Sequence, residues 1–239
     1  MINETRRIQS VERAMYILEQ IALAGGHIRL NDLAARTGLN KATLHGLLNT
    51  LAALGYIGRD GKSYTLGLRL RDLTLPLSDA DEHLRRRFRP LMETLHRTCG
   101  ENVYLAAPCG TREYRYLDVL GHDTRHGRPS PRGRREGLTT SAMGKVFLAT
   151  IPETARSLLL ADRLSGRLKT ELARIAECGY ALDLAEAEAG WHAFAVPLRV
   201  GGQTVAGISV AGAAERLPSA KLIEWAQHTQ QLLLHHTAA

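Results

Sequence analysis

Cysteines are few in this sequence and long apolar runs are missing. Three cysteines are spread widely over 239 residues, which fits reduced intracellular thiols better than a disulfide framework or a zinc site. No apolar run approaches the length of a membrane-spanning helix, and the N-terminal segment lacks the apolar centre of a signal peptide. We therefore expect a cytoplasmic protein with no membrane partner.

The sequence also lacks the motifs of several enzyme classes. It contains neither a GxSxG nucleophile elbow nor an HExxH metal motif. The segment GLTTSAMGKV resembles a phosphate-binding loop, but six residues instead of four separate Gly137 from Gly144, and Val146 stands where that loop needs Ser or Thr. We expect no catalytic residue, no metal ligand and no cofactor. Ten histidines and several carboxylates could still meet in space, so a small-molecule enzyme stays open as the least favoured alternative.

What the sequence does have is an excess of positive charge. The net charge is +7, and residues 1–75 hold ten Lys and Arg against six Asp and Glu. The longer remainder holds 21 Lys and Arg against 18 Asp and Glu, so positive charge is denser in the N-terminal part. This distribution favours an anionic partner.

Three helices are predicted in the N-terminal part. Apolar residues at spacings of three and four predict a first helix, which Gly25-Gly26 ends. Its expected buried residues are Ile8, Val11, Met15, Leu18 and Ile21. A second helix is expected to begin at Asn31, a good N-cap, and to stop at Gly38. The third begins after Asn40, and the tight turn between the last two helices is typical of a helix-turn-helix.

The third helix has an apolar face and a small, polar face. The apolar stripe consists of Leu44, Leu47, Leu48, Leu51 and Leu54. The opposite face consists of Ala42, His45, Gly46, Asn49 and Ala53. A glycine inside a helix costs roughly 0.5–1 kcal/mol relative to alanine. We interpret Gly46 as a residue of the outward face, where a side chain would meet DNA or nothing at all.

A β-hairpin is predicted directly after the third helix. Residues 56–59 and 62–66 flank Asp60-Gly61, a strong signal for a two-residue turn. A helix-turn-helix followed by a hairpin is a winged helix. Some winged helices bind proteins instead of DNA, and that alternative stays open.

Within this module the candidate DNA contacts fall into two groups. Arg59 and Lys62 at the hairpin tip, with Lys41 and Thr43 at the helix N-terminus, are expected to contact phosphates. The expected base readers are His45 and Asn49, because asparagine can bond the edge of adenine in the major groove. The predicted DNA-binding residues are Asn40, Lys41, Thr43, His45, Asn49, Arg59 and Lys62.

Several segments together resemble the IclR-type bacterial transcriptional regulators. The N-terminal segments are SVERAMYILEQIA, LNDLAARTGLNKATLHGLLNTLAALGYI and YTLGLRL. The later ones are GENVYLAA, GRREGLTTSAMGKVFLA, CGYALDLAEAEAGWHAFAVPL and VAGISVAG. The resemblance implies a DNA-binding winged helix, a linker helix and a C-terminal effector domain of GAF-like fold, in a protein that works as a homodimer or homotetramer.

The resemblance has departures on the recognition helix. Ala42 and Gly46 stand where the family usually carries serine and arginine. The hairpin is also shorter than usual. We therefore expect an atypical operator.

The remainder of the chain predicts a linker and an α+β domain. A leucine-rich helical pattern runs to Leu75-Pro76, and a new helix is expected to begin around Asp81, kinked or weakened at Pro90. The expected organisation is a DNA-binding domain over residues 1–70, a linker over 71–82 and an effector-binding and oligomerisation domain over 83–239.

Hairpin signals dominate this C-terminal domain. Two hairpins are predicted, around residues 108–111 and around Gly201-Gly202. Helices are expected near 140–150, over 168–178 before Gly179, and after Ser219. Residues 122–136, rich in Arg, Gly and Pro, are expected to form an exposed loop. An antiparallel sheet with segregated helices is an α+β sensor-like fold.

The resemblance also implies an effector pocket. The residues it carries over are Ala142, Met143, Gly144, Asp183, Ala193, Ser209 and Ala211. Amide groups at a helix N-terminus attract a carboxylate. Asp183 could accept a hydroxyl or amine of the ligand, or could only cap a turn, and Ser209 could be an ordinary strand residue.

Departures within this pocket shape the expected ligand. Ala193 and Ala211 replace a cysteine and a serine, so we expect a wider and more apolar cavity. Strand alternation is expected to place Trp191, Ala193 and Ala195 on one face and Ser209 with Ala211 on another. Trp191 beside small residues suits a flat or bulky ligand, although it could be ordinary core.

These observations predict a transcriptional regulator that binds a double-stranded DNA operator and is controlled by a small organic effector. The expected effector is a weakly polar or aromatic carboxylic acid, larger than glyoxylate or pyruvate. The main alternative is the same architecture without an effector, in which the C-terminal domain serves assembly only.

Overall fold

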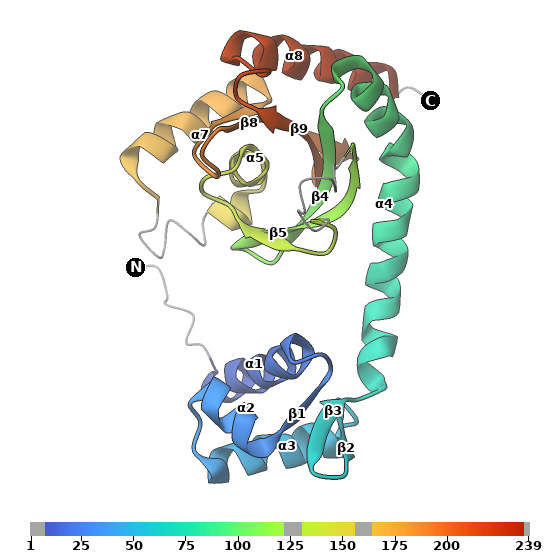
Figure 1. Ribbon diagram of the computed structural model, residues 1–239, viewed down its shortest axis with the longest axis vertical. Helices are drawn as coiled ribbons and strands as arrows, with labels where there is room; N and C mark the ends of the chain where they lie inside the picture. The colour runs from blue at the N-terminus through green and yellow to red at the C-terminus, as the bar shows by residue number, and fades with distance from the viewer. Residues whose placement is uncertain (1–7, 122–130, 156–163, 237–239) are drawn as a thin grey trace. The chain divides into compact units, whose positions relative to one another are not determined.

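The chain forms two compact units, which are described separately. The computed structural model describes residues 8–121, 131–155 and 164–236, and contacts divide the chain between Ala80 and Asp81 (Figure 1). The units share one helix, α4 (Arg69–Cys99), which begins in the first and ends in the second. Within the described ranges no helix is long and apolar enough to span a membrane.

The N-terminal unit packs three helices against a small antiparallel sheet. Its elements are α1 (Gln9–Leu23), β1 (His27–Arg29), α2 (Leu30–Thr37), α3 (Lys41–Ala53), β2 (Ile57–Asp60) and β3 (Ser63–Leu66). The strand order is β1-β3-β2. The predicted winged helix-turn-helix is therefore confirmed, with β1 as a strand that the sequence patterns missed.

The ends of the middle helices follow local chemistry. Gly38 closes α2 in the left-handed conformation with φ of 65°, where glycine avoids the steric penalty of a side chain. Asn40 begins α3, and its Oδ1 accepts a hydrogen bond from the Thr43 amide at 2.9 Å. The predicted start of α2 at Asn31 is wrong: β1 pairs with β3 up to Arg29, and the helix follows this strand directly with Arg29 as its N-cap.

The buried face of α1 differs from the predicted one. Ile17, Leu18 and Ile21 are buried, whereas Ile8, Val11 and Met15 are 55–66% exposed. Ile17 and Ile21 belong to the same buried cluster as Leu33 of α2 and Leu44 of α3. Ile8 precedes the helix as its N-cap and Val11 lies in its first turn. Leu54 was also predicted to be buried but is 47% exposed, because it stands at the C-cap of α3, beyond the residues that face the core.

The wing turn lies one residue later than predicted. Asp60 pairs with Ser63, so the two connecting residues are Gly61 and Lys62. Gly61 takes φ of 58°, which glycine adopts without strain. Lys62 stands at the exposed tip of the wing.

A single helix replaces the two that the sequence predicted around residue 80. α4 continues for 31 residues through Pro76 and Pro90. Each proline removes one backbone hydrogen bond, but the helix continues without a break on both sides of it. The burial of Phe88, Leu91 and Met92 adds packing that an isolated helix would lack.

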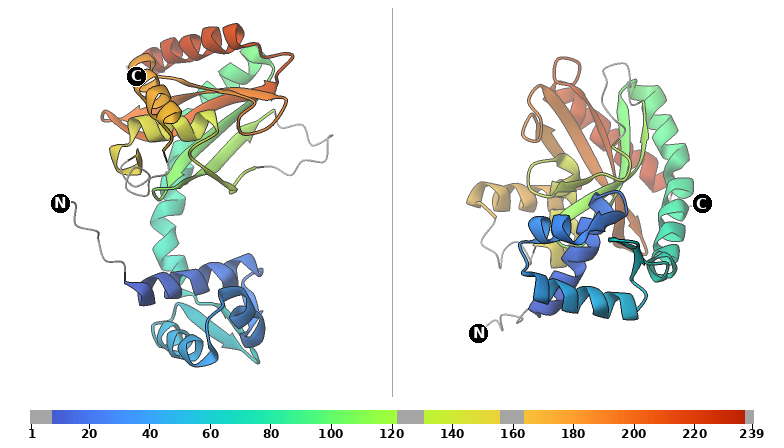
Figure 2. Two further views of the ribbon diagram at one scale, coloured as in Figure 1. Left: turned by 90° about the vertical axis from the view of Figure 1, so that its left-hand side faces the viewer. Right: turned by 60° about the horizontal axis from the view of Figure 1, so that its bottom comes forward.

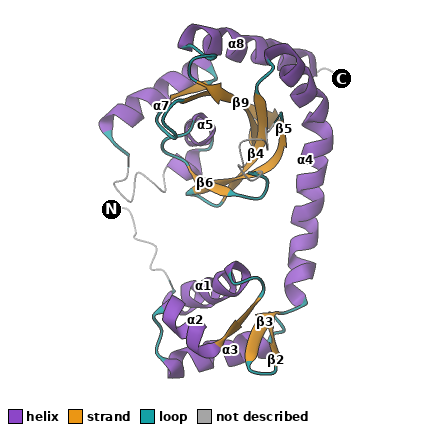
Figure 3. Cartoon of the chain, viewed as in Figure 1, coloured by secondary structure: helices purple, strands orange, loops and turns teal. Residues whose placement is uncertain are grey.

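The C-terminal unit is built on an antiparallel sheet (Figure 3). It has six strands in the order β6-β5-β4-β9-β8-β7. The strands are β4 (Asn102–Cys109), β5 (Glu113–Leu120), β6 (Arg135–Gly137), β7 (Ala181–Leu184), β8 (Trp191–Val200) and β9 (Gln203–Ala213). The helices are α5 (Ala142–Thr150), α7 (Gly166–Cys178) and α8 (Ser219–His236). This confirms the α+β class, the two predicted hairpins and the three predicted helices.

The sheet curves, and helices cover both of its faces (Figure 2). One face packs against α8 and the C-terminal part of α4, with Phe194, Val196 and Ile208 among the buried residues. The other face packs against α5 and α7, with Phe147, Ala181 and Ala195 among the buried residues. The cavity described below lies on this second face.

One predicted loop is partly a strand. Residues 122–130 of that segment lie outside the described residues. Arg135–Gly137 form β6, which pairs with Glu113–Arg115 of β5 at the sheet edge. Three residues are too short a run to show strand periodicity, so this pairing was not visible in the sequence.

Candidate DNA-binding surface and ligand cavity

The outward face of α3 is small, polar and open. Ala42, Gly46 and Asn49 are exposed, and His45 is half-buried. A Cβ added at Gly46 would meet no atom within 4 Å. The interior glycine therefore serves no packing purpose within this unit, and the predicted position of Gly46 on the outward face is confirmed.

Other predicted DNA contacts have partners of their own. The Asn40 side chain is occupied as the α3 cap, since it accepts from the Thr43 amide. Arg59 Nη2 donates to Tyr64 Oη at 2.8 Å, and the guanidinium carbon lies 5.1 Å from the centre of the Tyr64 ring. Tyr64 therefore holds Arg59 in a defined position on the wing.

The C-terminal unit contains a cavity of about 1490 Å³ on the α5 side of the sheet. This exceeds the roughly 300–1,000 Å³ of common ligand pockets. Most of the predicted effector residues line it: Ala142, Met143, Asp183, Trp191, Ala193, Ser209 and Ala211. Gly144 is not among the lining residues. Its amide donates to Ser141 Oγ at 3.1 Å, and a Cβ there would stand 2.5 Å from Leu138 Cα.

Strand register gathers these residues on one face. Ala193 pairs with both Asp183 and Ala211, and Ala195 pairs with Ser209. Residues directly opposite each other in an antiparallel pair point to the same side. The prediction that Ser209 and Ala211 lie on a different face from Ala193 is therefore wrong, and alanines with one serine form the cavity floor.

The N-terminus of α5 opens onto this floor. Ser141 caps the helix, and the next two residues, Ala142 and Met143, line the cavity. The first amide groups of an α-helix have no partner within the helix and carry its positive dipole end. This end of the cavity therefore suits a carboxylate.

Asp183 lies near this end with one oxygen in use. Its Oδ1 accepts from the amides of Glu186 at 2.8 Å and Ala187 at 3.3 Å. The Asp183 side chain thus caps the turn after β7. This is one of the two roles that the sequence left open for it. Its Oδ2 has no hydrogen-bond partner among the described residues. Burial raises the pKa of this carboxyl, although the two amides and Lys145 oppose that effect.

A cluster of hydroxyl groups around Glu136 was missed from sequence. Glu136 Oε2 accepts from Tyr114 Oη at 2.5 Å and from Tyr116 Oη at 2.9 Å. Tyr114 Oη also lies 3.0 Å from Ser141 Oγ. Arg134 donates to the other carboxylate oxygen, Oε1. Desolvation is the main cause that raises the pKa values of both tyrosines, so both hydroxyls keep their protons. We name these residues, Tyr114, Tyr116, Arg134, Glu136 and Ser141, the Glu136 cluster.

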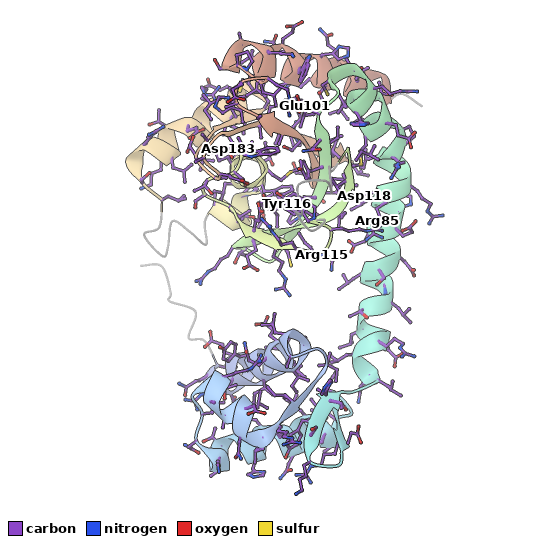
Figure 4. The ribbon with its side chains drawn as sticks, viewed as in Figure 1. Arg85, Glu101, Arg115, Tyr116, Asp118 and Asp183 are labelled. Carbon is purple, nitrogen blue, oxygen red and sulfur yellow. The ribbon has the colours of Figure 1, made fainter. Side chains whose placement is uncertain are left out.

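The cavity is lined by both aromatic and charged side chains. The rings of Tyr104 and Tyr116 are 5.6 Å apart and those of Tyr114 and Tyr116 are 5.3 Å apart. Trp191 adds a further aromatic ring to the lining. The lining also includes charged side chains, among them Glu136, Glu101 and Asp183. Figure 4 labels the last two.

Three ion pairs lie around the cavity. Arg216 donates twice to Glu101, at 2.6 and 2.8 Å, and this hydrogen bonding is the first cause that raises the Arg216 pKa. Lys145 is fully buried, and its Nζ contacts Glu171 at 3.0 Å and Glu186 at 2.7 Å. Lys145 thereby ties α5 to α7 and to the turn after β7. Among the described residues no group of His, Cys, Asp and Glu side chains could hold a metal ion.

Comparison with known proteins gives consistent matches along the chain. Residues 79–233 match the family model described as bacterial transcriptional regulator IclR C-terminal, and residues 10–61 match the IclR helix-turn-helix domain. The transcriptional regulator XynR of Escherichia coli (strain K12) is 30% identical over 238 residues, with 94% of each chain covered. The glycerol operon regulatory protein of Streptomyces griseus is 34% identical over 233 residues, which cover 89% of this chain and 87% of the relative.

Solved structures show the same fold. An IclR family regulator from Brucella abortus gives a TM-score of 0.71 at 24% identity, covering 99% of this chain and 94% of that one. An IclR homologue from Microbacterium hydrocarbonoxydans, complexed with 4-hydroxybenzoate, gives a TM-score of 0.68 at 22% identity, covering 96% and 100%.

Proposed function

The chain belongs to the IclR family of bacterial transcriptional regulators, and from this premise we propose that an aromatic carboxylic acid controls its binding to an operator. The helix-turn-helix makes it a DNA-binding protein. The effector, the residues that bind it and the oligomeric state are the parts that we propose.

On the DNA side, α3 enters the major groove and the wing lies over a phosphate strand. His45 and Asn49 read bases from the outward face of α3. Lys41 and Thr43 contact phosphates at its N-terminus, where Asn40 holds the first turn. Arg59 and Lys62 add phosphate contacts from the wing. A homodimer or homotetramer would place two such modules on a pseudo-palindromic site.

The cavity carries the proposal of an effector. The N-terminus of α5 supplies donors for a carboxylate, alanines form the floor, and Tyr104, Tyr116 and Trp191 supply aromatic surface. A flat ring between aromatic walls over a floor of small side chains buries apolar area without steric conflict. The relative that holds 4-hydroxybenzoate, a compact aromatic acid, has the same fold.

Calorimetry with the full-length protein tests this proposal. We expect benzoate and its substituted derivatives to bind, and to change the affinity for a DNA site, while glyoxylate and pyruvate bind weakly or not at all. Tight binding of the two small acids with none of the aromatic ones would contradict the effector class. Binding of no acid would favour a C-terminal domain that serves assembly only.

A further inference from the structure

The hydrogens of the Glu136 cluster can be assigned from its geometry. An ionised carboxylate only accepts hydrogen bonds, so Tyr114 and Tyr116 donate their single hydroxyl hydrogens to Glu136 Oε2. Because the Tyr114 hydrogen is directed to Glu136, Ser141 Oγ is the donor in its contact with Tyr114 Oη, and it also accepts from the Gly144 amide. Every hydroxyl hydrogen of the cluster is then used within it.

This assignment leaves one acceptor position of the Glu136 carboxylate free. A carboxylate offers about four acceptor positions, and three donors from the described residues reach Glu136: Tyr114, Tyr116 and Arg134. Its side chain is 25% exposed and lines the cavity. The wall at Glu136 therefore presents a charged acceptor with capacity for one more donor.

The neighbouring N-terminus of α5 has the opposite character. It presents amide donors, and Ser141 joins the two groups because its Oγ caps α5 and also bonds the tyrosine that bonds Glu136. A ligand carboxylate at the helix end would lie close to the like charge of Glu136. A hydroxyl group on the same ligand would supply the missing donor and offset that repulsion.

We propose that Glu136 selects the effector by its hydroxyl group, so that the ligand is an aromatic hydroxy acid with its carboxylate at the N-terminus of α5 and its hydroxyl donating to Glu136. This inference rests on the proposed function and narrows its ligand class. Tyr114, Tyr116 and Arg134 are positioning residues that hold the Glu136 carboxylate in place.

Matched pairs of acids with and without a hydroxyl group test the assignment. The probes are benzoate against 2-, 3- and 4-hydroxybenzoate, and phenylacetate against mandelate, titrated calorimetrically into the full-length protein. At least one hydroxylated acid should bind wild type about tenfold more tightly than its parent, as expected for a hydrogen bond to a charged group. A lack of preference in every pair overturns the inference without any variant.

The Glu136→Gln substitution separates recognition from a structural role. It should reduce the preference to about threefold or less and should strengthen binding of the parent acid, because the like charge is gone and Arg134 is released. Equal weakening of both acids would mark Glu136 as structural only and overturn the inference. Glu113→Gln is the matched control, because it makes the same change on the neighbouring strand outside the cavity lining, and it should alter neither affinity.

Tyr116→Phe locates the acceptor within the cluster. This variant keeps the Glu136 charge and should keep the preference for the hydroxylated acid, whereas loss of the preference would move recognition to Tyr116 and contradict the assignment. Failure of wild type to bind any of these acids would overturn the proposed effector class itself. Binding without discrimination overturns only the role of Glu136.

Discussion

At the scale of single residues, Gly46 and Asp183 show how a feature that lowers stability indicates a binding surface. Gly46 weakens α3 although nothing in its own unit would obstruct a side chain there. Asp183 is a carboxylate that is only 5% exposed, with one oxygen that no described residue satisfies. Folding alone does not require either feature, and each belongs to a surface where we propose a partner.

Gly46→Ala should therefore change stability and DNA binding in opposite directions. The free energy of unfolding should rise by about 0.5–1 kcal/mol, because alanine has the higher helix propensity. The affinity for specific DNA should fall, because the added methyl group stands between the helix backbone and the groove. Urea unfolding and fluorescence anisotropy measure the two effects, with a nonspecific duplex as the control. Unchanged operator affinity would show that Gly46 does not face DNA.

Asp183→Asn should make stability less dependent on pH. Burial raises the folded-state pKa of Asp183 above its ordinary value of 3.8. Its favourable contribution is therefore complete below pH 3.8 and is lost as the pH rises through the folded-state pKa. The variant, neutral at every pH, should unfold at a higher temperature than wild type at pH 7, and the difference should shrink on acidification. Asp79→Asn, an exposed control, should show no such trend.

The sequence predicted individual cavity residues only where they lie within a recognisable local segment. Ala142, Met143 and Asp183 came from a family resemblance and do line the cavity. Tyr114 and Glu136 lie 22 positions apart in sequence, and only the pairing of β5 with β6 brings them together. No local pattern could show that contact, and Glu136 was missed for this reason.

At the scale of elements, α5 links the cavity to the rest of the C-terminal unit. Its N-terminus opens onto the ligand space, and Lys145 one turn later anchors it to α7 and to the turn after β7. That turn contains Ala185, which has φ of 64° and is the one non-glycine residue with positive φ in the described part of the chain. The ion pairs of Lys145 thus hold a strained turn beside the cavity.

Lys145→Met should destabilise the C-terminal unit strongly. The substitution leaves Glu171 and Glu186 beside each other without their shared cation, and removing one partner of a buried ion pair costs about 3–5 kcal/mol. Both glutamates are partly exposed, at 19% and 35%, so we expect a value near the lower limit. Thermal and urea unfolding measure it. Adding Glu171→Gln and Glu186→Gln should recover part of the loss, and Lys169→Met on the exposed side of α7 should change little.

Element prediction succeeded where periodicity and turn residues agreed. The hairpin around Gly201-Gly202 and the helix closed by Gly179 were correct for this reason. It failed for α4, where Pro76 indicated an end that the helix passes through. It also failed for β1 and β6, because strands of three residues exist only through pairing with a distant strand.

At the scale of the whole molecule, the chain combines a DNA-binding unit with a unit that holds a large polar and aromatic cavity. The fold class and the family were within reach of the sequence because both units carry recognisable segments over nearly the whole chain. The ligand class could not be predicted from the sequence, because it depends on which side chains the sheet register brings to one face. Regulation requires that occupation of the cavity changes the affinity for DNA.

The most direct test of this account is selection of duplexes from a random library, followed by anisotropy titrations of the enriched sequence and a scrambled control across a salt series. We predict an enriched pseudo-palindromic site that binds about a thousandfold or more tightly than the control, with an affinity that falls steeply with salt. Failure to enrich any sequence, with equal and weak binding to both duplexes, would contradict the claim that this protein is a sequence-specific regulator.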